Sequence, residues 1–176
     1  MILVSNHLLR LGSIDIKPDN VIRINCAWVD GAAGLEKALD IPYNVFLDYP
    51  AGRTKPPAPK LTLDEAIEMA HRFPSVSYFA VSNAEDYESL AAIRMVLPKR
   101  IELVPKIETE AGVDRIAEVI HATRCSHVML DKEDLWVNAD ERPLEYARLV
   151  QRVRNYCNDN GIAIFELSGV IFDDGQ

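Results

Sequence analysis

A lysine and a glutamate stand two positions apart where a run of apolar residues ends. Lys106 and Glu108 close the strand-like stretch Ile101–Ile107 and continue just beyond it. In an extended chain, residues two apart point to the same side, so both side chains face one way. Burying such charges costs free energy unless they pair with each other or bind a ligand. The pair is therefore either an internal salt bridge or part of a charged site.

The second interpretation requires another carboxylate. Mg²⁺ takes oxygen ligands and often uses one or two carboxylates together with the substrate. Asp134 provides one after the next strand-like stretch, His127–Leu130. Its surrounding sequence, DKED, is also typical of an exposed acidic loop. We expect Glu108 and Asp134 to bind Mg²⁺ or Mn²⁺, with Lys106 beside the ion.

Other polar residues fall within or just after two earlier strand-like runs. Arg23 and Asn25 alternate along the run VIRINCA, so they point to one side of it. Asp48 lies near the end of the run NVFLDY, and Arg53 follows soon after. In parallel α/β folds, the carboxyl ends of the strands meet at the active-site edge. These four residues are therefore further candidates for a site.

The elements that must position these residues alternate along the chain. Short runs rich in β-branched residues are typical of parallel strands that are covered on both faces. We predict strands at Val21–Ala27, Asn44–Tyr49, Ser77–Val81, Ile101–Ile107, His127–Leu130 and Ile162–Leu167, with Ile2–Ser5 as a weaker candidate.

Helical patterns lie between these runs. Thr62 with Glu65 and Ser82 with Glu85 have the spacing of capping boxes, and Pro143 suits a first helical turn. We predict helices from Thr62 to Phe73, from Ser82 to just before Pro98, from Thr109 to Ala122 and over Leu144–Asn158, with a short one at Gly34–Leu39. This alternation indicates right-handed βαβ units.

Two architectures fit this order, an open doubly wound sheet and a (β/α)₈ barrel. No GxGxxG or GxxxxGK[ST] phosphate turn follows an early strand, as an open sheet usually has. A complete barrel usually takes about 250 residues and at least about 200, whereas this chain has 176. The pattern alone leaves both architectures open. The length suits one domain over residues 1–176.

The composition of the chain indicates which binding partners and which cellular compartment to expect. A net charge of −8 disfavours binding to nucleic acid, because like charges repel. No apolar run approaches the roughly 20 residues that a membrane span needs. Cys26, Cys125 and Cys157 are odd in number and form no CxxC motif, which favours a reducing compartment. We expect a cytoplasmic protein that does not bind membranes.

Two segments that contain the candidate metal ligands resemble a known superfamily. VPKIETEAGVDRIAEVI followed by VMLDKEDLWV resembles the metal-binding region of pyruvate kinase, and equally that of class II pyruvate aldolases and citrate lyase β subunits. The resemblance implies the barrel fold of the phosphoenolpyruvate/pyruvate superfamily. It also implies that Glu108 and Asp134 bind the metal ion and that Lys106 transfers a proton or assists phosphoryl transfer.

Earlier segments resemble the same enzymes in the same order. VIRINCAW is similar to the RxNxSHG strand of the kinase and the VRVN strand of the lyases, which implies that Arg23 grips a substrate carboxylate or phosphate, with Asn25 beside it. SVSYFAVSNAEDYESLAAIR is similar to a kinase segment that ends in AEDV. FLDYPAGRT resembles a kinase motif two residues longer, which implies substrate-binding roles for Asp48 and Arg53.

The sequence also departs from the kinase pattern. Ala27 and Trp28 stand where the kinase has a Ser-His pair, and prolines lead from Arg53 directly into the next helix, without room for a lid domain. The eighth strand and helix of a barrel have no counterpart. We therefore expect a TIM-type (β/α) barrel that is incomplete or truncated at its C-terminal end.

The resemblance favours a lyase or aldolase that depends on a divalent metal and cleaves a small 2-oxo acid through an enolate. In this hypothesis Arg23 and Lys106 are catalytic. One alternative is kinase-like phosphoryl transfer from an enol phosphate. Another is a non-catalytic barrel fragment that serves binding or assembly, since unpaired strand edges invite another chain. Because such unpaired edges can also pair with a second copy of the chain, we expect a homo-oligomer.

Overall fold

The computed structural model describes residues 2–6, 20–52 and 57–171. The chain divides into two compact units. The first unit comprises Met1–Phe79, Leu97–Ile101 and Leu167–Gln176, and the second comprises Ala80–Val96 and Glu102–Glu166. The single domain predicted over the whole chain stays a prediction.

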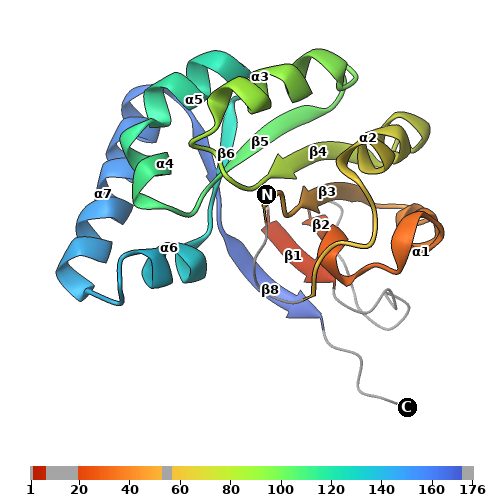
Figure 1. Cartoon of the computed structure of the whole chain (residues 1–176), viewed down its shortest axis with the longest axis horizontal. Coiled ribbons are helices and arrows are strands. Elements are labelled where there is room, and N and C mark those ends of the chain that lie inside the picture. The colour runs from red at the N-terminus through yellow and green to blue at the C-terminus, as the bar shows by residue number, and fades with distance from the viewer. Residues whose placement is uncertain (1, 7–19, 53–56, 172–176) are drawn as a thin grey trace. The chain divides into compact units, whose positions relative to one another are not determined.

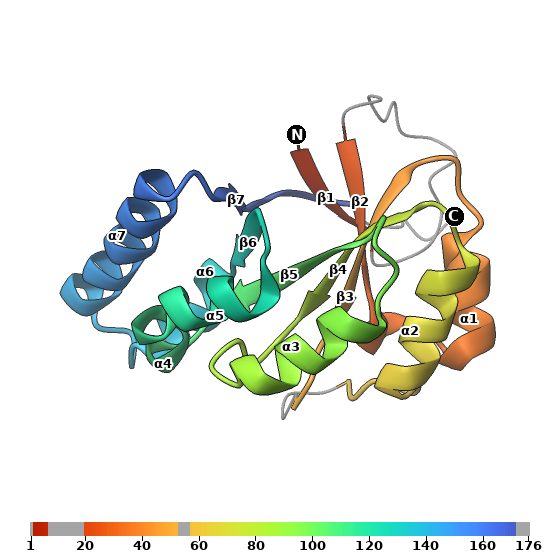
Figure 2. The ribbon, with the colours of Figure 1, turned by 90° about the horizontal axis from the view of Figure 1, so that it is seen from above.

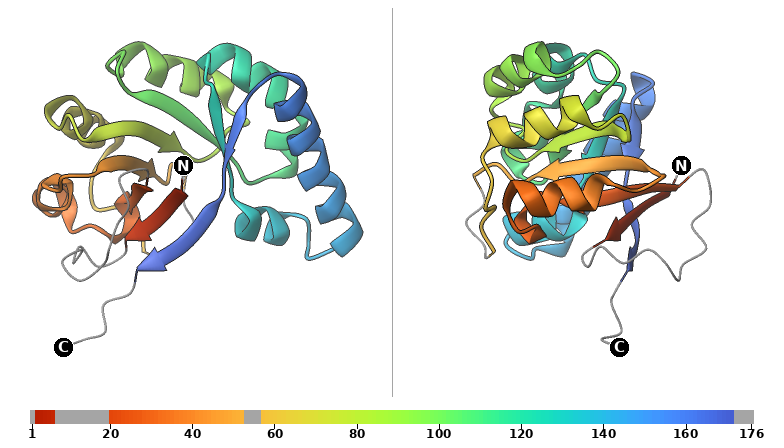
Figure 3. Two further views of the ribbon diagram at one scale, coloured as in Figure 1. Left: turned by 180° about the vertical axis from the view of Figure 1, so that it is seen from behind. Right: turned by 90° about the vertical axis from the view of Figure 1, so that its right-hand side faces the viewer.

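The first unit is built on parallel strands. β1 (Ile2–Asn6) lies between β2 (Asn20–Asn25) and β8 (Leu167–Ile171), and β2 also pairs with β3 (Asn44–Tyr49). The neighbouring ribbons of β1 and β8 can be followed in Figure 3. Most residues of β2 and β3 are buried on both sides of the strand. This burial agrees with the near-continuous apolar runs in their sequences.

Two helices belong to the first unit. α1 (Gly31–Leu39) and α2 (Leu63–Arg72) contact each other, and Figure 2 shows them side by side. The predicted capping box is present: the Thr62 hydroxyl accepts from the Glu65 N–H, and the Glu65 carboxylate accepts from the Thr62 N–H at 2.7 Å. The local sequence thus fixes where α2 begins.

The second unit contains its own set of parallel strands. β4 (Val76–Val81) enters it from the first unit, and β5 (Glu102–Ile107), β6 (His127–Leu130) and β7 (Ala163–Phe165) follow. β5 pairs with β6, and β6 pairs with β7, in both cases in parallel. The prediction that the strands ending at Ile107 and Leu130 are parallel neighbours is confirmed.

Helices connect these strands. Within the second unit they are α3 (Tyr87–Val96), α4 (Glu110–Asp114), α5 (Ile116–Thr123), α6 (Lys132–Asn138) and α7 (Pro143–Asp159). α3 contacts α5, and α7 contacts both α4 and α6, as can be followed in Figure 1. No helix in the described ranges is long and apolar enough to cross a membrane.

The helix predicted from Thr109 to Ala122 is wrong in one respect, because it is two helices. Arg115 separates α4 from α5, and its backbone has φ −99° and ψ 16°. The apolar spacing continues through this break, which is why the sequence shows one helical period. The short helix α6 was not predicted, because the acidic sequence at its start, DKED, is typical of an exposed loop.

The strand predicted over Ile162–Leu167 is also wrong in extent, because it is divided into β7 and β8. Glu166 separates them, and its carboxylate pairs with Lys132 and with Arg154, the latter at 2.9 Å. The prediction that no eighth strand exists is therefore wrong. The predicted fold class, an incomplete parallel α/β barrel, is confirmed.

Candidate metal centre

Three carboxylates of the second unit converge. Glu108, Asp131 and Asp134 each offer an oxygen atom, and these oxygens lie within 4.8 Å of one another. All three residues are partly buried. The structure thus brings together the two carboxylates that the sequence proposes as metal ligands, and it adds Asp131.

The pairing of β5 with β6 produces this convergence. Lys106 lies opposite Met129 and Ile107 opposite Leu130, so the two strands end at the same level. The Asp131 N–H then donates to the Ile107 carbonyl oxygen at 3.1 Å, which extends the pairing by one more bond. Glu108 and Asp131 are consequently the first residues beyond two adjacent strand ends.

A short helix supplies the third carboxylate. Asp131 is the N-cap of α6, and its side chain accepts from the Asp134 N–H at 3.4 Å. Capping fixes the direction in which α6 leaves the strand. Asp134 lies in the first turn of α6, and its carboxylate therefore lies near those of Glu108 and Asp131.

Lys106 provides the positive charge of the cluster. Its side chain is only 5% exposed, and Nζ lies 3.1 Å from Glu108 Oε2 and 3.4 Å from Asp131 Oδ2. It also donates to the Ser82 hydroxyl at 3.4 Å. Among the described residues, the cluster combines the three carboxylates with this ammonium, so its charge is negative. A divalent cation would offset that charge.

The donor set suits a hard divalent cation. Mg²⁺ and Mn²⁺ prefer carboxylate oxygens. Two oxygens on opposite sides of one Mg²⁺ lie about 4.2 Å apart, because each bond is about 2.1 Å long. Three oxygens 4.8 Å apart would each lie about 2.8 Å from their common centre, so each needs to move by at most about 0.7 Å to reach the ion. The residues fit such an ion.

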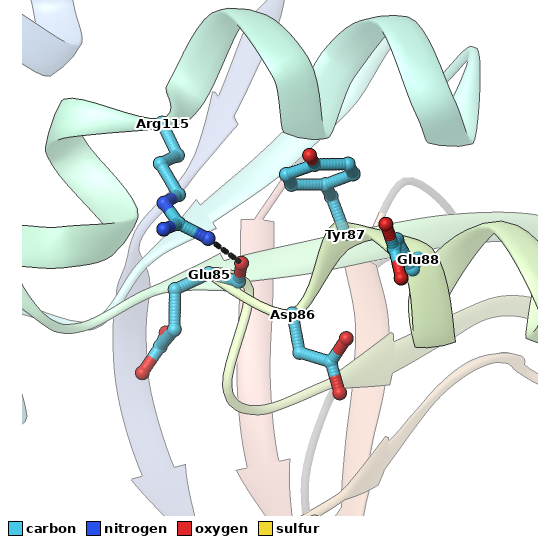
Figure 4. A pocket seen from close by; sticks show the side chains of 5 residues that line it. All are labelled: Glu85, Asp86, Tyr87, Glu88 and Arg115. Atoms are coloured by element: carbon cyan, nitrogen blue, oxygen red, sulfur yellow. Dashed lines mark hydrogen bonds between the residues drawn. The ribbon is translucent and has the colours of Figure 1, made fainter.

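The turn between β4 and α3 adjoins the cluster. The Asn83 N–H donates to Glu108 Oε1 at 3.3 Å. Glu85 is held twice: its carbonyl oxygen accepts from Arg115 at 3.3 Å, as Figure 4 shows, and its carboxylate accepts from the Thr109 hydroxyl at 3.2 Å. These bonds connect the turn to both ends of α4.

The same turn borders a hollow of about 400 Å³. Glu85, Asp86, Tyr87, Glu88 and Arg115 line it. Hydrogen bonds from the Ser89 side chain and, next, from the Ser89 N–H lower the pKa of Asp86. The hollow therefore presents mainly negative charge.

Asp131 was the site residue that sequence reasoning left out. In the sequence it is only part of the acidic stretch DKED, from which Asp134 was taken as the metal ligand. The signal that could have found it is its position directly after His127–Leu130. In a parallel sheet, the first polar residue after a strand reaches the active-site edge.

The predicted substrate-binding residues Arg23 and Asp48 lie in the first unit and bind each other. Arg23 Nε donates to Asp48 Oδ2 at 2.9 Å, and Nη2 contacts the same oxygen. Arg23 is 8% exposed and Asp48 is fully buried. Burial, and next the Asp48 charge, raise the pKa of the nearby Cys26 thiol. The role of Arg23 in gripping a substrate stays a prediction.

Asn25 has a local structural contact. Its side-chain oxygen accepts from the Ala27 N–H at 2.9 Å and caps the 3-10 turn Cys26–Trp28. The strand predicted to reach Ala27 therefore ends two residues earlier, at Asn25. Arg53 lies outside the described residues.

Comparison with known proteins identifies the fold. No family model matches this chain, and no curated protein matches it. A crystal structure of a variant of the citrate synthase SbnG is similar over 98% of this chain and 86% of that chain, with a TM-score of 0.68 and 11% sequence identity. At this identity the similarity concerns the fold alone.

Proposed function

We propose that this protein is a lyase or aldolase that uses Mg²⁺ or Mn²⁺ to act on a small 2-oxo acid. The observation that carries the proposal is the convergence of Glu108, Asp131 and Asp134 beside a buried lysine. The similarity of the fold to that of a citrate synthase supports it coarsely. A cytoplasmic location is part of the same proposal.

In this proposal the three carboxylates hold the ion at the ends of β5 and β6. When bound, the ion supplies a Lewis acid that withdraws electrons from the 2-oxo group of the substrate. Breaking the carbon–carbon bond would leave its electron pair on the carbon next to that group, while the other fragment would depart as a carbonyl compound once its hydroxyl gave up a proton to a base. Lys106 Nζ, held between Glu108 and Asp131, gives this carbon a proton.

Arg23 is the proposed partner of the substrate carboxylate. A guanidinium binds a carboxylate through two parallel hydrogen bonds. In the structure its Nε and Nη2 atoms both contact one oxygen of Asp48, Oδ2. Under the proposal, Asp48 keeps the guanidinium in place.

One observation favours a second candidate, a non-catalytic module for binding or assembly. Among the described residues, the Lys106 ammonium has acceptors in Ser82, Glu108 and Asp131 for its three protons. Such saturation is what a purely structural ion pair needs when it is buried.

Two measurements separate the candidates. Calorimetric titration with Mn²⁺ tests the metal centre, and loss of pyruvate methyl protons to deuterated solvent tests proton transfer without knowledge of the true substrate. We expect the wild type to bind Mn²⁺ and, once loaded, to exchange these protons. Binding without exchange would rule out the lyase chemistry, and absence of binding would leave the structural module as the better explanation.

A further inference from the structure

We propose that Ser82 and Asn83, in the turn between β4 and α3, are positioning residues for the metal centre. Ser82 holds Lys106, Asn83 holds Glu108, and together they set the affinity for the metal ion. This inference rests on the proposed function, and it concerns residues that neither the family resemblance nor the cluster itself assigns to the site.

Asn83 fixes one oxygen of Glu108 from the main chain. Its N–H donates to Oε1, whereas Lys106 approaches Oε2. The two oxygens are thus held by different partners, which fixes the rotation of the carboxylate group. Asn83 has φ 59°, a left-handed conformation that asparagine tolerates better than most residues. The turn depends on this conformation to aim its N–H at Glu108.

Ser82 acts on the lysine. Its side chain is buried, and its hydroxyl accepts one of the three Lys106 protons. The ammonium group therefore shares its charge between a neutral hydroxyl and two carboxylates. Without the hydroxyl, the ammonium would turn more fully toward Glu108 and Asp131. It would then compete more strongly with a metal ion for the same oxygens.

The turn is itself held in place by bonds that do not involve the carboxylate cluster. The Asp86 N–H donates to the Asn83 carbonyl oxygen at 3.0 Å. Glu85 accepts from Thr109 and from Arg115, which tie the turn to α4. Residues around a metal site that orient its ligands commonly change metal affinity by about 10- to 100-fold when they are replaced.

A double-mutant cycle tests Ser82, with Mn²⁺ alone as the probe and calorimetry as the readout. We expect Ser82→Ala to weaken Mn²⁺ binding about tenfold and Ser82→Thr, which keeps the hydroxyl, to stay near the wild type. In a Lys106→Met background, Ser82→Ala should change the affinity by less than about twofold, because it acts through the lysine.

Paired variants test Asn83. Asn83→Gly keeps the N–H and favours the left-handed conformation, so Mn²⁺ affinity should stay near that of the wild type. Asn83→Val disfavours this conformation, moves the N–H away from Glu108, and should weaken binding about tenfold. Circular dichroism confirms that each variant is folded before it is compared.

The outcomes separate this inference from the proposed function. If the wild type does not bind Mn²⁺, both fail together. If it binds and Ser82→Ala has the same effect with or without Lys106, or no effect at all, only the positioning role is overturned. Weakening that disappears in the Lys106→Met background, together with normal binding by Asn83→Gly, supports it.

Discussion

At the scale of single residues, the centre is a balance between one ammonium and three carboxylates. Lys106 stands where its charge can serve either as a fixed counter-ion or as the source of a proton. A buried pair that loses one partner is typically destabilised by about 3–5 kcal/mol. Because three carboxylates lie together here, with Lys106 beside two of them, the loss of a carboxylate and the loss of the lysine should have opposite consequences.

Glu108→Gln should abolish Mn²⁺ binding while leaving the protein folded. The amide is a poorer ligand than the carboxylate, and its loss of charge relieves repulsion with Asp131 and Asp134. We expect the melting temperature without metal to be unchanged or higher. Glu133→Gln, an exposed carboxylate in the same acidic sequence, is the matched control. Unchanged Mn²⁺ affinity in Glu108→Gln would end the metal hypothesis.

Lys106→Met should fold, bind Mn²⁺ at least as tightly as the wild type, and lose pyruvate proton exchange by roughly 10²–10⁴-fold. Removing a positive charge next to the ligands favours the cation, and removing Nζ takes away the proton donor. Calorimetry and deuterium exchange measure the two effects separately. Should the variant mainly lose about 3–5 kcal/mol of stability and keep its exchange rate, Lys106 is a structural partner.

Sequence reasoning could predict part of this centre. The two-residue spacing of Lys106 and Glu108 in an apolar run is a local signal, and the structure places both side chains together. Asp131 could not be distinguished in the same way, because its place beside Glu108 depends on the register of two strands. The engagement of Arg23 with Asp48 is likewise a contact across strands, which spacing along one chain does not encode.

At the scale of elements, the opposite ends of β5 and β6 carry their own polar cluster. Glu102 accepts from the Ser126 N–H at 2.7 Å and contacts the His127 ring nitrogen Nδ1 at 2.9 Å. His127 stacks on Phe165 of β7. These contacts join the start of β5 to the start of β6 and thereby support their register.

Glu102→Gln should destabilise the protein by about 1 kcal/mol near neutral pH. Burial acts to raise the pKa of Glu102, but hydrogen bonds from His127 and Ser126 outweigh it and lower the pKa below 4.5. Because the pKa of Glu102 is lower in the folded state, its ionised carboxylate stabilises the fold above about pH 4.5. This contribution is lost as the pH falls through the lowered pKa.

Urea unfolding at several pH values measures this effect. The difference between wild type and Glu102→Gln should be largest above about pH 5 and should shrink in acid. Glu118→Gln, an exposed carboxylate on α5, should show no such difference at any pH. A constant difference over the whole range would exclude linkage to the ionisation of Glu102.

The elements themselves were largely predictable, and the exceptions have physical causes. The spacing of apolar residues predicted most of the strands, and the capping box at Thr62 predicted where α2 begins. The break at Arg115 was not visible, because α4 and α5 keep the same apolar spacing on either side. Nor was the division at Glu166, since its two ion pairs come from α6 and α7.

At the scale of the whole molecule, we expect at least a dimer. β7, three residues long, pairs with β6 and with no further strand in the described part of the chain. Unpaired edges of parallel strands favour association. Light scattering at micromolar concentration checks this, and a monomeric mass would contradict it.

The division into two units has a consequence for any attempt to separate them. The chain passes from one unit to the other at Phe79–Ala80, Val96–Leu97, Ile101–Glu102 and Glu166–Leu167. No single cut, and no single contiguous fragment, can deliver either unit whole. A peptide covering residues 102–166 would hold every carboxylate of the centre and its lysine, yet it would lack the turn that orients them. Gene fragments or proteolytic pieces of this chain should therefore be reassembled before their metal binding is judged.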